Sequence, residues 1–332
     1  MKVSIIIPVY NVEHYIEECL QSVANQTMTE GIECIIVDDR GQDNSMDIVR
    51  HFVDDYQGAI SFHILKHEKN SGLSAARNTG IKAATGEFIY LLDSDDFIVP
   101  ECIKTLYSIA IANNADVVQA AYITVSQHLE NAMSIKHPAF TDDRKYIKRT
   151  FLDYDRNPVM AQNRLIRRQL IIDNALWFKE GIIHEDNYWT FFLAKHVKRM
   201  AFCPEKLYFY RETPGSITKS KNTEKEVLAF RTMVRDFTAN IDDFERGAQK
   251  RYIFLHILLL DRYKDYIDTQ EWKDMLRAFL HSCSLAEKIV FGLTMTSKGY
   301  VRQKSINLLQ RLFLSNANET THNLICRRTA QR

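Results

Sequence analysis

Short apolar runs rich in β-branched residues alternate with helix-forming segments over residues 1–120. The runs read VSIIIPVY, ECIIVDD, SFHILKH, EFIYLLDSDD and ADVVQAAYITV, and one of the segments between them reads LSAARNTGIKAATG. Strands that alternate with helices build βαβ units, whose strands lie parallel in one sheet. The sequence therefore predicts an α/β fold in which helices flank a mixed, mainly parallel sheet.

The rest of the chain changes character twice. Residues 142–220 carry a mixed pattern, whereas the chain beyond them reads as helical and contains no proline. We therefore expect an α/β domain over 1–220, with halves at 1–120 and 121–220, followed by an α-helical C-terminal region over 221–332.

Composition and charge exclude several classes of protein. The formal net charge is +1, so no excess of basic residues points to nucleic acid as a partner. No run reaches the roughly 18 apolar residues of a membrane span, and Pro8 interrupts the apolar N-terminus, which lacks a signal-peptide cleavage pattern. The six cysteines are scattered without a CxxC pair, which favours reduced thiols over a zinc ribbon or a disulfide framework. We expect a cytoplasmic protein.

Polar side chains follow three of the predicted strands where each strand ends. Tyr10 and Asn11 follow the first, Asp38 and Asp39 end the second, and the stretch 93–96 follows FIYLL with three aspartates. Ligands of parallel α/β sheets bind beyond the carboxyl ends of the strands. The sequence therefore predicts a binding site at this edge of the sheet.

The aspartates at 93–96 need a compensating charge. Two unit charges about 4 Å apart repel by roughly 4 kcal/mol at an effective dielectric constant near 20. Asp93 and Asp95, which are two residues apart, can both approach one magnesium or manganese ion that substrate phosphates also bind. The alternative is an N-cap for a helix near 100–113, which would explain one aspartate, Asp96, but not three.

Other polar residues near the predicted site allow two interpretations. Asp38 or Asp39 can accept hydrogen bonds from a nucleobase or a ribose, whereas Asp43 and Asn11 are expected to cap the helices that follow them. Arg77 can face a base or a diphosphate, or it can pair with one of the aspartates. Gly72, in the same segment, permits close approach of the backbone.

Five motifs carry a resemblance to a known family. In order along residues 1–220 they read VSIIIPVYN, VDDRGQDNS, NSGLSAARNTGIKAATGEFIYLLDSDD, HEDNYW and YRETPGSIT. Together they resemble the motifs of the bacterial family 2 glycosyltransferases, which have the GT-A fold. The resemblance implies a catalytic domain over 1–220, with a nucleotide-sugar-binding half over 1–120 and an acceptor-binding half over 121–220.

The resemblance also implies a reaction. Family members are inverting transferases that take a sugar from a nucleotide-diphosphate donor, usually a UDP-sugar, with manganese or magnesium held by a DXD motif. The acceptor would be a hydroxyl of a glycan or a lipid-linked glycan in cell-surface polysaccharide synthesis. By position, the donor-binding residues would be Pro8, Val9, Tyr10, Asn11, Asp38, Asp39, Gly72, Arg77, Asp93 and Ser94.

The same comparison by position implies roles near the reacting atoms. Asp93 and Asp95 would form the DXD metal motif. Asp186 would be the catalytic base, although Glu185 and Asp186 could instead cap the helix that starts there. Further contacts with the donor diphosphate or the acceptor would come from Glu185, Arg211 and Ser216.

The chain departs from the family in one segment. Relatives often read tryptophan-asparagine-lysine-leucine where this chain has AQNRL at 161–165, so the aromatic is missing and Arg164 replaces the lysine. This segment is expected on the acceptor side. His184 could contact a metal ion or the acceptor, but a lone histidine is more often a packing residue.

The C-terminal region contains a basic segment. No acidic residue occurs from Lys288 to Asn318, where cations interleave with apolar side chains. This pattern fits a helix on the anionic inner surface of a membrane, or an ordinary packed helix with a solvated basic face.

Two other functions remain as alternatives. One is a nucleotide-sugar-binding module that has lost catalysis. The other is an oxidoreductase on a Rossmann sheet, against which the absence of a GxGxxG motif argues.

Overall fold

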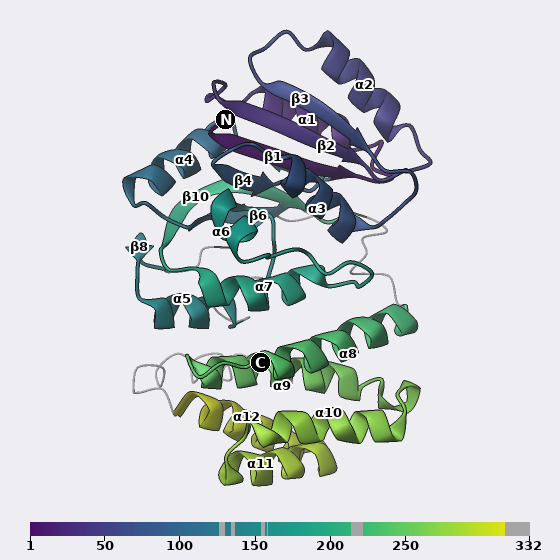
Figure 1. Ribbon diagram of the computed structural model, residues 1–332, viewed down its shortest axis with the longest axis vertical. Helices are drawn as coiled ribbons and strands as arrows, with labels where there is room; N and C mark the ends of the chain where they lie inside the picture. Colours follow the sequence, from purple (N-terminus) through teal and green to yellow (C-terminus); the bar gives the residue numbers. More distant parts are fainter. Residues whose placement is uncertain (126–129, 134–136, 154–156, 158, 214–221, 316–332) are drawn as a thin grey trace. The chain divides into compact units, whose positions relative to one another are not determined.

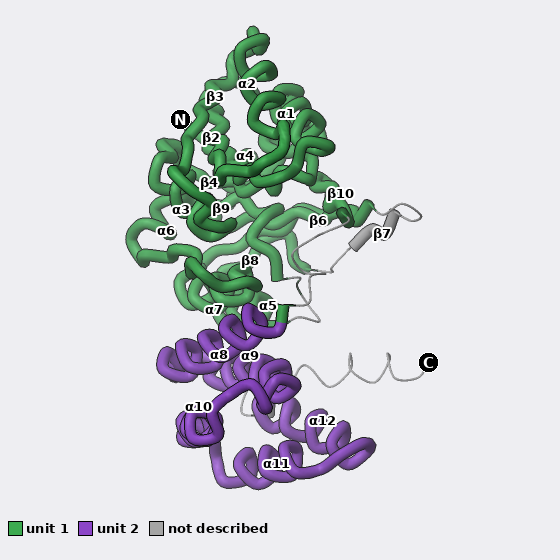
Figure 2. Tube along the Cα trace, turned by 90° about the vertical axis from the view of Figure 1, so that its right-hand side faces the viewer, with its two compact units in different colours: residues 1–222 green, residues 223–332 purple. Residues whose placement is uncertain are grey.

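The computed structural model describes residues 1–125, 130–133, 137–153, 157, 159–213 and 222–315 (Figure 1). The chain forms two compact units, Met1–Asn222 and Thr223–Arg332 (Figure 2). Within the described part, no helix combines the length and the apolar character that a membrane crossing requires.

Unit 1 is built on one mixed sheet in the order β3-β2-β1-β4-β9-β6-β10-β5. The longest ladders are parallel and join β1 to β2, β2 to β3, and β6 to β10. β9 runs antiparallel to both β4 and β6 and so links the two parallel parts. The strands are β1 (Val3–Val9), β2 (Ile32–Asp38), β3 (Ser61–Lys66), β4 (Phe88–Leu91), β5 (Phe97–Ile98), β6 (Val117–Val125), β7 (Glu130–Met133), β8 (Phe140–Thr141), β9 (Arg164–Arg167) and β10 (Met200–Arg211).

Helices flank this sheet, which confirms the predicted fold class (Figure 1). Every residue of β1 and β2 is buried, as expected for parallel strands that helices cover on both faces, whereas β3 lies at the edge and is partly exposed. The helices of unit 1 are α1 (Ile16–Ala24), α2 (Ser45–Asp55), α3 (Leu73–Ala83), α4 (Cys102–Ala112), α5 (Arg144–Phe151), α6 (Arg168–Asp173) and α7 (Glu185–His196).

The predicted cap at Asn11 is wrong. α1 begins only at Ile16, and Asn11 has a left-handed φ of +52°. Its Oδ1 instead accepts a hydrogen bond of 2.7 Å from the backbone N–H of Gln42, because the loop before α2 lies against the end of β1. Asp43 accepts hydrogen bonds from the backbone and hydroxyl of Ser45, at the start of α2.

Unit 2 is helical among its described residues. Phe254 lies at its centre, with ring centroids 5.8 Å from Phe291 and 5.9 Å from Phe313. A buried ion pair joins Lys250 to Glu287. Its elements are α8 (Thr223–Ala239), α9 (Arg246–Asp261), the 3-10 turn η2 (Lys264–Tyr266), α10 (Thr269–His281), α11 (Leu285–Thr296) and α12 (Gly299–Ser315).

Candidate active site

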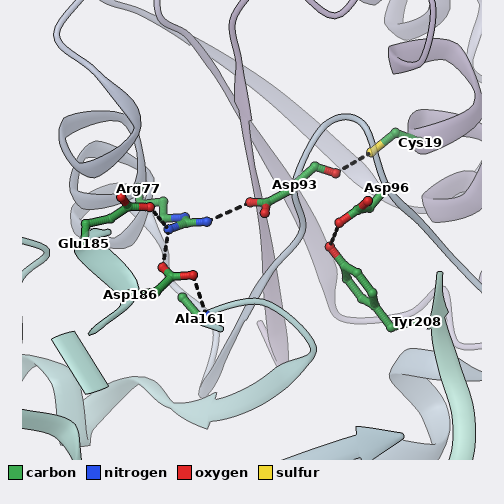
Figure 3. Close-up of polar contacts among 8 residues, drawn as sticks. All are labelled: Cys19, Arg77, Asp93, Asp96, Ala161, Glu185, Asp186 and Tyr208. Carbon is green, nitrogen blue, oxygen red and sulfur yellow. Dashed lines mark hydrogen bonds and ion pairs between the residues drawn. The ribbon is translucent and has the colours of Figure 1, made fainter. Parts of the chain in front are cut away.

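The side chain of Arg77 lies at the centre of the candidate active site (Figure 3). It extends from α3 and is only 1% exposed. Its Nη2 donates to Oδ1 of Asp93 at 2.8 Å, and its Nη1 donates to Oε1 of Glu185 at 2.9 Å and to Oδ1 of Asp186 at 2.7 Å. The guanidinium carbon lies 5.1 Å from the ring centroid of Phe178. One buried cation therefore joins carboxylates that come from the loop after β4 and from α7.

The start of α7 fixes the two acidic side chains. Glu185 and Asp186 occupy its first turn, after His184, which has a left-handed φ of +58° and no side-chain capping hydrogen bond. The second carboxylate oxygen of Asp186 accepts a hydrogen bond of 3.1 Å from the backbone N–H of Ala161. Both oxygens of Asp186 thus bind groups outside the helix, namely Arg77 and Ala161. The alternative in which Asp186 caps α7 is wrong.

The charges in this cluster alter one another's pKa values. Burial alone would lower the pKa of Arg77, but the surrounding carboxylates outweigh burial and raise it, so the guanidinium stays protonated. Burial and the negative charge of Asp186 raise the pKa of Glu185 to about 7, against the opposing effect of Arg77. Glu185 is therefore protonated more readily than an ordinary glutamate.

Asp96 is buried and has a structural role. Its Oδ1 accepts a hydrogen bond of 2.7 Å from the backbone N–H of Arg211, and its Oδ2 accepts a short one from the hydroxyl of Tyr208. Burial, with the charges of its two neighbouring aspartates, raises the pKa of Asp96 well above its ordinary value. α4 begins at Cys102 with Glu101 as its N-cap, so Asp96 is not the helix cap that the sequence allowed.

Asp95 is less compensated than Asp93, which pairs with Arg77. It accepts a hydrogen bond of 3.2 Å from the hydroxyl of Thr213, and it forms no ion pair with any described residue. Burial and the charge of Asp93 raise the pKa of Asp95 to about 6, and Arg211 offsets only part of that effect. A bound cation would favour the charged form of this carboxylate and so lower the pKa of Asp95.

We expect Asp95→Asn to stabilise the metal-free protein at pH 7.5. The folded protein holds the Asp95 proton more tightly than the unfolded chain, because the pKa rises from 3.8 to about 6. This contribution favours folding at low pH and is lost as the pH rises through about 6. Asparagine removes the charge, so the free energy of unfolding should rise on the order of 2 kcal/mol at pH 7.5 and roughly a third as much at pH 4.5.

Urea unfolding in chelator measures this difference. The matched variant is Asp93→Asn, which should gain no such stability because Asp93 already has a cationic partner in the buried Arg77. An Asp95→Asn protein no more stable than wild type at pH 7.5 would show that the Asp95 charge costs nothing in the folded state.

Asp93 and Asp95 fit a cation that the substrate also binds. The described residues include no group of three or more His, Cys, Asp or Glu side chains that could hold a metal ion by itself. Magnesium and manganese, however, are commonly bound by one or two carboxylates together with substrate phosphates. Asp93 directs its Oδ1 to Arg77, which leaves Oδ2 for such an ion. These residues therefore suit a metal ion that the protein and the substrate phosphates bind together, and not one that protein side chains bind alone.

Asp39, at the end of β2, uses both oxygens within the protein. Oδ1 accepts from the backbone N–H of Ser71 at 2.7 Å and lies 2.8 Å from Nδ1 of His67, while Oδ2 accepts from the backbone N–H of Gly72 at 2.8 Å. Gly72 has a φ of +88°, which favours glycine, and it immediately precedes α3. Asp39 thus holds the loop that positions the helix of Arg77.

The remaining donor-binding candidates differ in exposure. Tyr10 is 47% exposed at the end of β1, and Asn11 follows it on the surface. Asp38 accepts a hydrogen bond of 2.8 Å from the backbone N–H of Arg40. The buried candidates are Pro8, Val9, Asp38 and Ser94.

Arg211 lies at the end of β10 beside the aspartate loop. Its Nη2 donates to Glu18 at 2.6 Å, and its guanidinium carbon lies 5.1 Å from the ring centroid of Tyr15 and 5.3 Å from that of Phe97. The structure thus brings Arg211 close to the carboxylates predicted to bind the cation. Ser216 lies outside the described residues.

The segment in which the chain departs from the family, 161–165, is buried throughout. Arg164 is fully buried, donates from Nε to Gln119 at 3.1 Å and lies 5.1 Å from the ring centroid of Phe151. This arginine therefore belongs to the interior of unit 1. Ala161 contributes its backbone N–H to Asp186, as described above.

Several residues of the site were not predicted from the sequence. His67 bridges Asp39 and Thr79, with its Nε2 2.9 Å from the threonine hydroxyl. His67 follows β3, so the argument that binding residues stand at strand ends would have predicted it if it had been applied to this strand as well. Tyr208 had no such signal, whereas Thr213 lies in the motif YRETPGSIT, from which only Arg211 and Ser216 were predicted to belong to the site.

A family comparison now identifies the kind of protein. Residues 4–174 match the model of Glycosyl transferase family 2. The chain belongs to this family. This family 2 chain is similar to the uncharacterized glycosyltransferase EpsJ of Bacillus subtilis (strain 168), with 35% identity over 227 residues, which cover 65% of the chain and 63% of EpsJ. The aligned part thus spans less than two thirds of EpsJ.

Solved structures confirm the GT-A fold. TarS 1–349 of S. aureus in complex with UDP-GlcNAc superposes with a TM-score of 0.68 and 21% identity, covering 95% of this family 2 chain and 92% of that one. The mannosyltransferase PcManGT of Pyrobaculum calidifontis, in complex with GDP-Man and Mn²⁺, has a TM-score of 0.54 and 16% identity, covering 95% and 86%. At such identities the likeness shows the fold. Because the chain belongs to a glycosyltransferase family, the oxidoreductase alternative is wrong.

Proposed function

We propose that this chain is an inverting glycosyltransferase that moves a sugar from a UDP-sugar to a hydroxyl of a glycan or lipid-linked glycan. The observation that carries the proposal is the buried Arg77, which joins Asp93 to Glu185 and Asp186 at 2.7–2.9 Å. It connects the carboxylate expected to face the donor diphosphate with the carboxylate expected to face the acceptor. The complex of TarS with UDP-GlcNAc supports a UDP-sugar as the first donor to test. The buried free cysteines of the described part fit a cytoplasmic enzyme.

The donor would bind at the carboxyl edge of the sheet. The exposed Tyr10 and the end of β2 would contact the nucleoside. Asp93 and Asp95 would hold magnesium or manganese, which when bound would neutralise the diphosphate charge. Arg211, which lies close enough to lower the pKa of Asp95, would stabilise the charge that grows on the leaving diphosphate.

The acceptor would react on the opposite face of the sugar. Asp186 would take the proton of the acceptor hydroxyl while that oxygen forms a bond to the anomeric carbon. The bond from the anomeric carbon to the diphosphate oxygen would break, and UDP would leave with the bonding electrons. The hydrogen bonds from Arg77 and Ala161 would hold the Asp186 carboxylate in position.

We expect donor binding to depend on a divalent cation. UDP and UDP-sugars should raise the melting temperature of the full chain in manganese and much less in chelator. Asp95→Ala should remove this dependence, because Asp95 is the less compensated carboxylate of the motif. Asp47→Ala, which removes an exposed aspartate of α2, is the matched control and should bind as wild type.

Slow UDP release tests catalysis separately from binding. A panel of UDP-sugars and GDP-mannose with manganese should yield free nucleotide diphosphate for one donor, with water as acceptor. Equal binding of UDP in chelator and in manganese would contradict the metal site. Binding without any release, from any donor, would favour the non-catalytic binding module instead.

A further inference from the structure

Helices α11 and α12 pack against the same aromatic core of unit 2. The Phe291 ring of α11 lies 5.8 Å from Phe254 and 5.7 Å from Phe279, and the Phe313 ring of α12 lies 5.9 Å and 6.2 Å from the same two rings. The two helices also pack against each other (Figure 2). The face of each helix opposite its phenylalanine therefore points away from this core.

The outer face of α11 is apolar. Leu285, Ile289 and Leu293 are 75%, 59% and 48% exposed. They recur every four residues, and at roughly 100° per residue they lie on the side of the helix opposite Phe291. Single exposed apolar residues are common on protein surfaces, but a continuous stripe marks an interaction surface.

The outer face of α12 is basic. Tyr300 is 71% exposed, and Lys304 and Arg311 lie on the same side of the helix, opposite Phe313. The Lys304 ammonium lies 4.5 Å from the Tyr300 ring centroid. We call the stripe on α11 together with this face of α12 the outer face.

No negative charge balances these cations nearby in the sequence. Between residues 282 and 315 the one acidic residue is Glu287, which is buried and paired with Lys250. Lys288 and Lys298 add two further exposed cations to the same segment. The outer face thus combines exposed leucine, isoleucine and tyrosine side chains with cations that form no ion pair within the part of the chain that the structure describes.

We propose that the outer face docks on an anionic lipid bilayer. Apolar side chains that enter the interfacial region, flanked by lysine and arginine, are the features of a helix lying in a membrane surface. Each basic side chain near an anionic surface adds to the attraction, and the tyrosine suits the boundary between headgroups and acyl chains. A second copy of the chain would bring the same cations to the same face and would be repelled. This proposal stands on unit 2 and does not depend on the chemistry of unit 1.

Flotation of the full chain with vesicles tests the proposal. The probes are vesicles of phosphatidylcholine alone and of phosphatidylcholine mixed with phosphatidylglycerol. Wild type should float with the anionic vesicles at least about tenfold more than with the neutral ones, and less at high salt. Two triple variants should lose this binding. The first is Leu285→Ser, Ile289→Ser, Leu293→Ser. The second is Lys288→Gln, Lys304→Gln, Arg311→Gln, which removes the exposed cation next to Ile289 in the sequence and the two cations of the α12 face.

Matched variants of the same unit control for composition and charge. Tyr266→Ser removes an exposed aromatic side chain outside the outer face, and Lys264→Gln, Lys273→Gln, Arg277→Gln removes equal charge on η2 and α10. Both should float as wild type. The proposal is overturned if wild type stays at the bottom with anionic vesicles, or if the controls lose binding as fully as the outer-face variants. The proposal is also overturned if wild type does not bind vesicles but forms a dimer that the Leu285→Ser, Ile289→Ser, Leu293→Ser variant dissociates. The outer face would then be an interface between copies of the chain.

Discussion

Asp186→Asn is expected to reduce sugar transfer by at least about a hundredfold while UDP-sugar binding in manganese stays near wild type. Asparagine keeps the shape and one oxygen acceptor but cannot take a proton. The melting temperature should change little, because Arg77 keeps its bonds of 2.8 Å to Asp93 and 2.9 Å to Glu185. Transfer rate, donor affinity and thermal melting are the three measurements, and only the first should move strongly.

A similar aspartate outside the site provides the control for Asp186. Asp47 also stands in the first turn of a helix and pairs with an arginine, Arg50, at 2.7 Å, but it is exposed. Asp47→Asn should leave transfer unchanged. If Asp186→Asn transfers sugar at the wild-type rate, Asp186 is not the base. Glu185→Gln would then be the next variant to assay, because its pKa of about 7 also suits proton transfer.

The sheet could be predicted because local sequence determines its strands. A buried parallel strand contains a short apolar run, and β1, β2 and β4 each contain one, namely IIIPV, CIIV and FIYL. The strand-end argument also placed Asp93 and Asp95 at the correct edge. Helix starts were predicted less well, because Asn11 and Asp96 bind backbone groups of other segments and not the helices that follow them.

The contact between Arg77 and α7 could not be derived from periodicity. From the sequence, Arg77 could bind a ligand or pair with an aspartate. The structure pairs it with carboxylates, two of which lie 108 and 109 residues away along the chain. A helix pattern shows which face is apolar, but it does not show which distant helix brings acids to a buried cation. Asp96 and Tyr208 are a similar case, since 112 residues separate them. Only the folded sheet brings such groups together.

Arg77→Met is expected to destabilise the protein by about 3–5 kcal/mol at pH 7.5, the largest effect on folding that we foresee. Methionine fills a similar volume beside Phe178 but leaves Asp93, Glu185 and Asp186 without their shared cation. Breaking a buried ion pair from one side is costly, because the remaining charge stays buried and unpaired. Arg77→Lys should recover only part of the loss, since an ammonium is a point charge that cannot reproduce the planar fork of guanidinium donors.

The pH dependence of this loss gives a sharper test than its size. Arg77 lowers the pKa of Glu185, so removing the guanidinium should raise that pKa above its present value of about 7. The folded variant then binds protons more tightly than the unfolded chain, and its stability should improve as the pH falls from 7.5 to 5.5. Urea unfolding at both pH values measures this, with Arg50→Met as the matched control, because its exposed pair with Asp47 is worth about 1 kcal/mol or less. If Arg77→Met loses as little as Arg50→Met, or loses equally at both pH values, the three carboxylates do not depend on this cation.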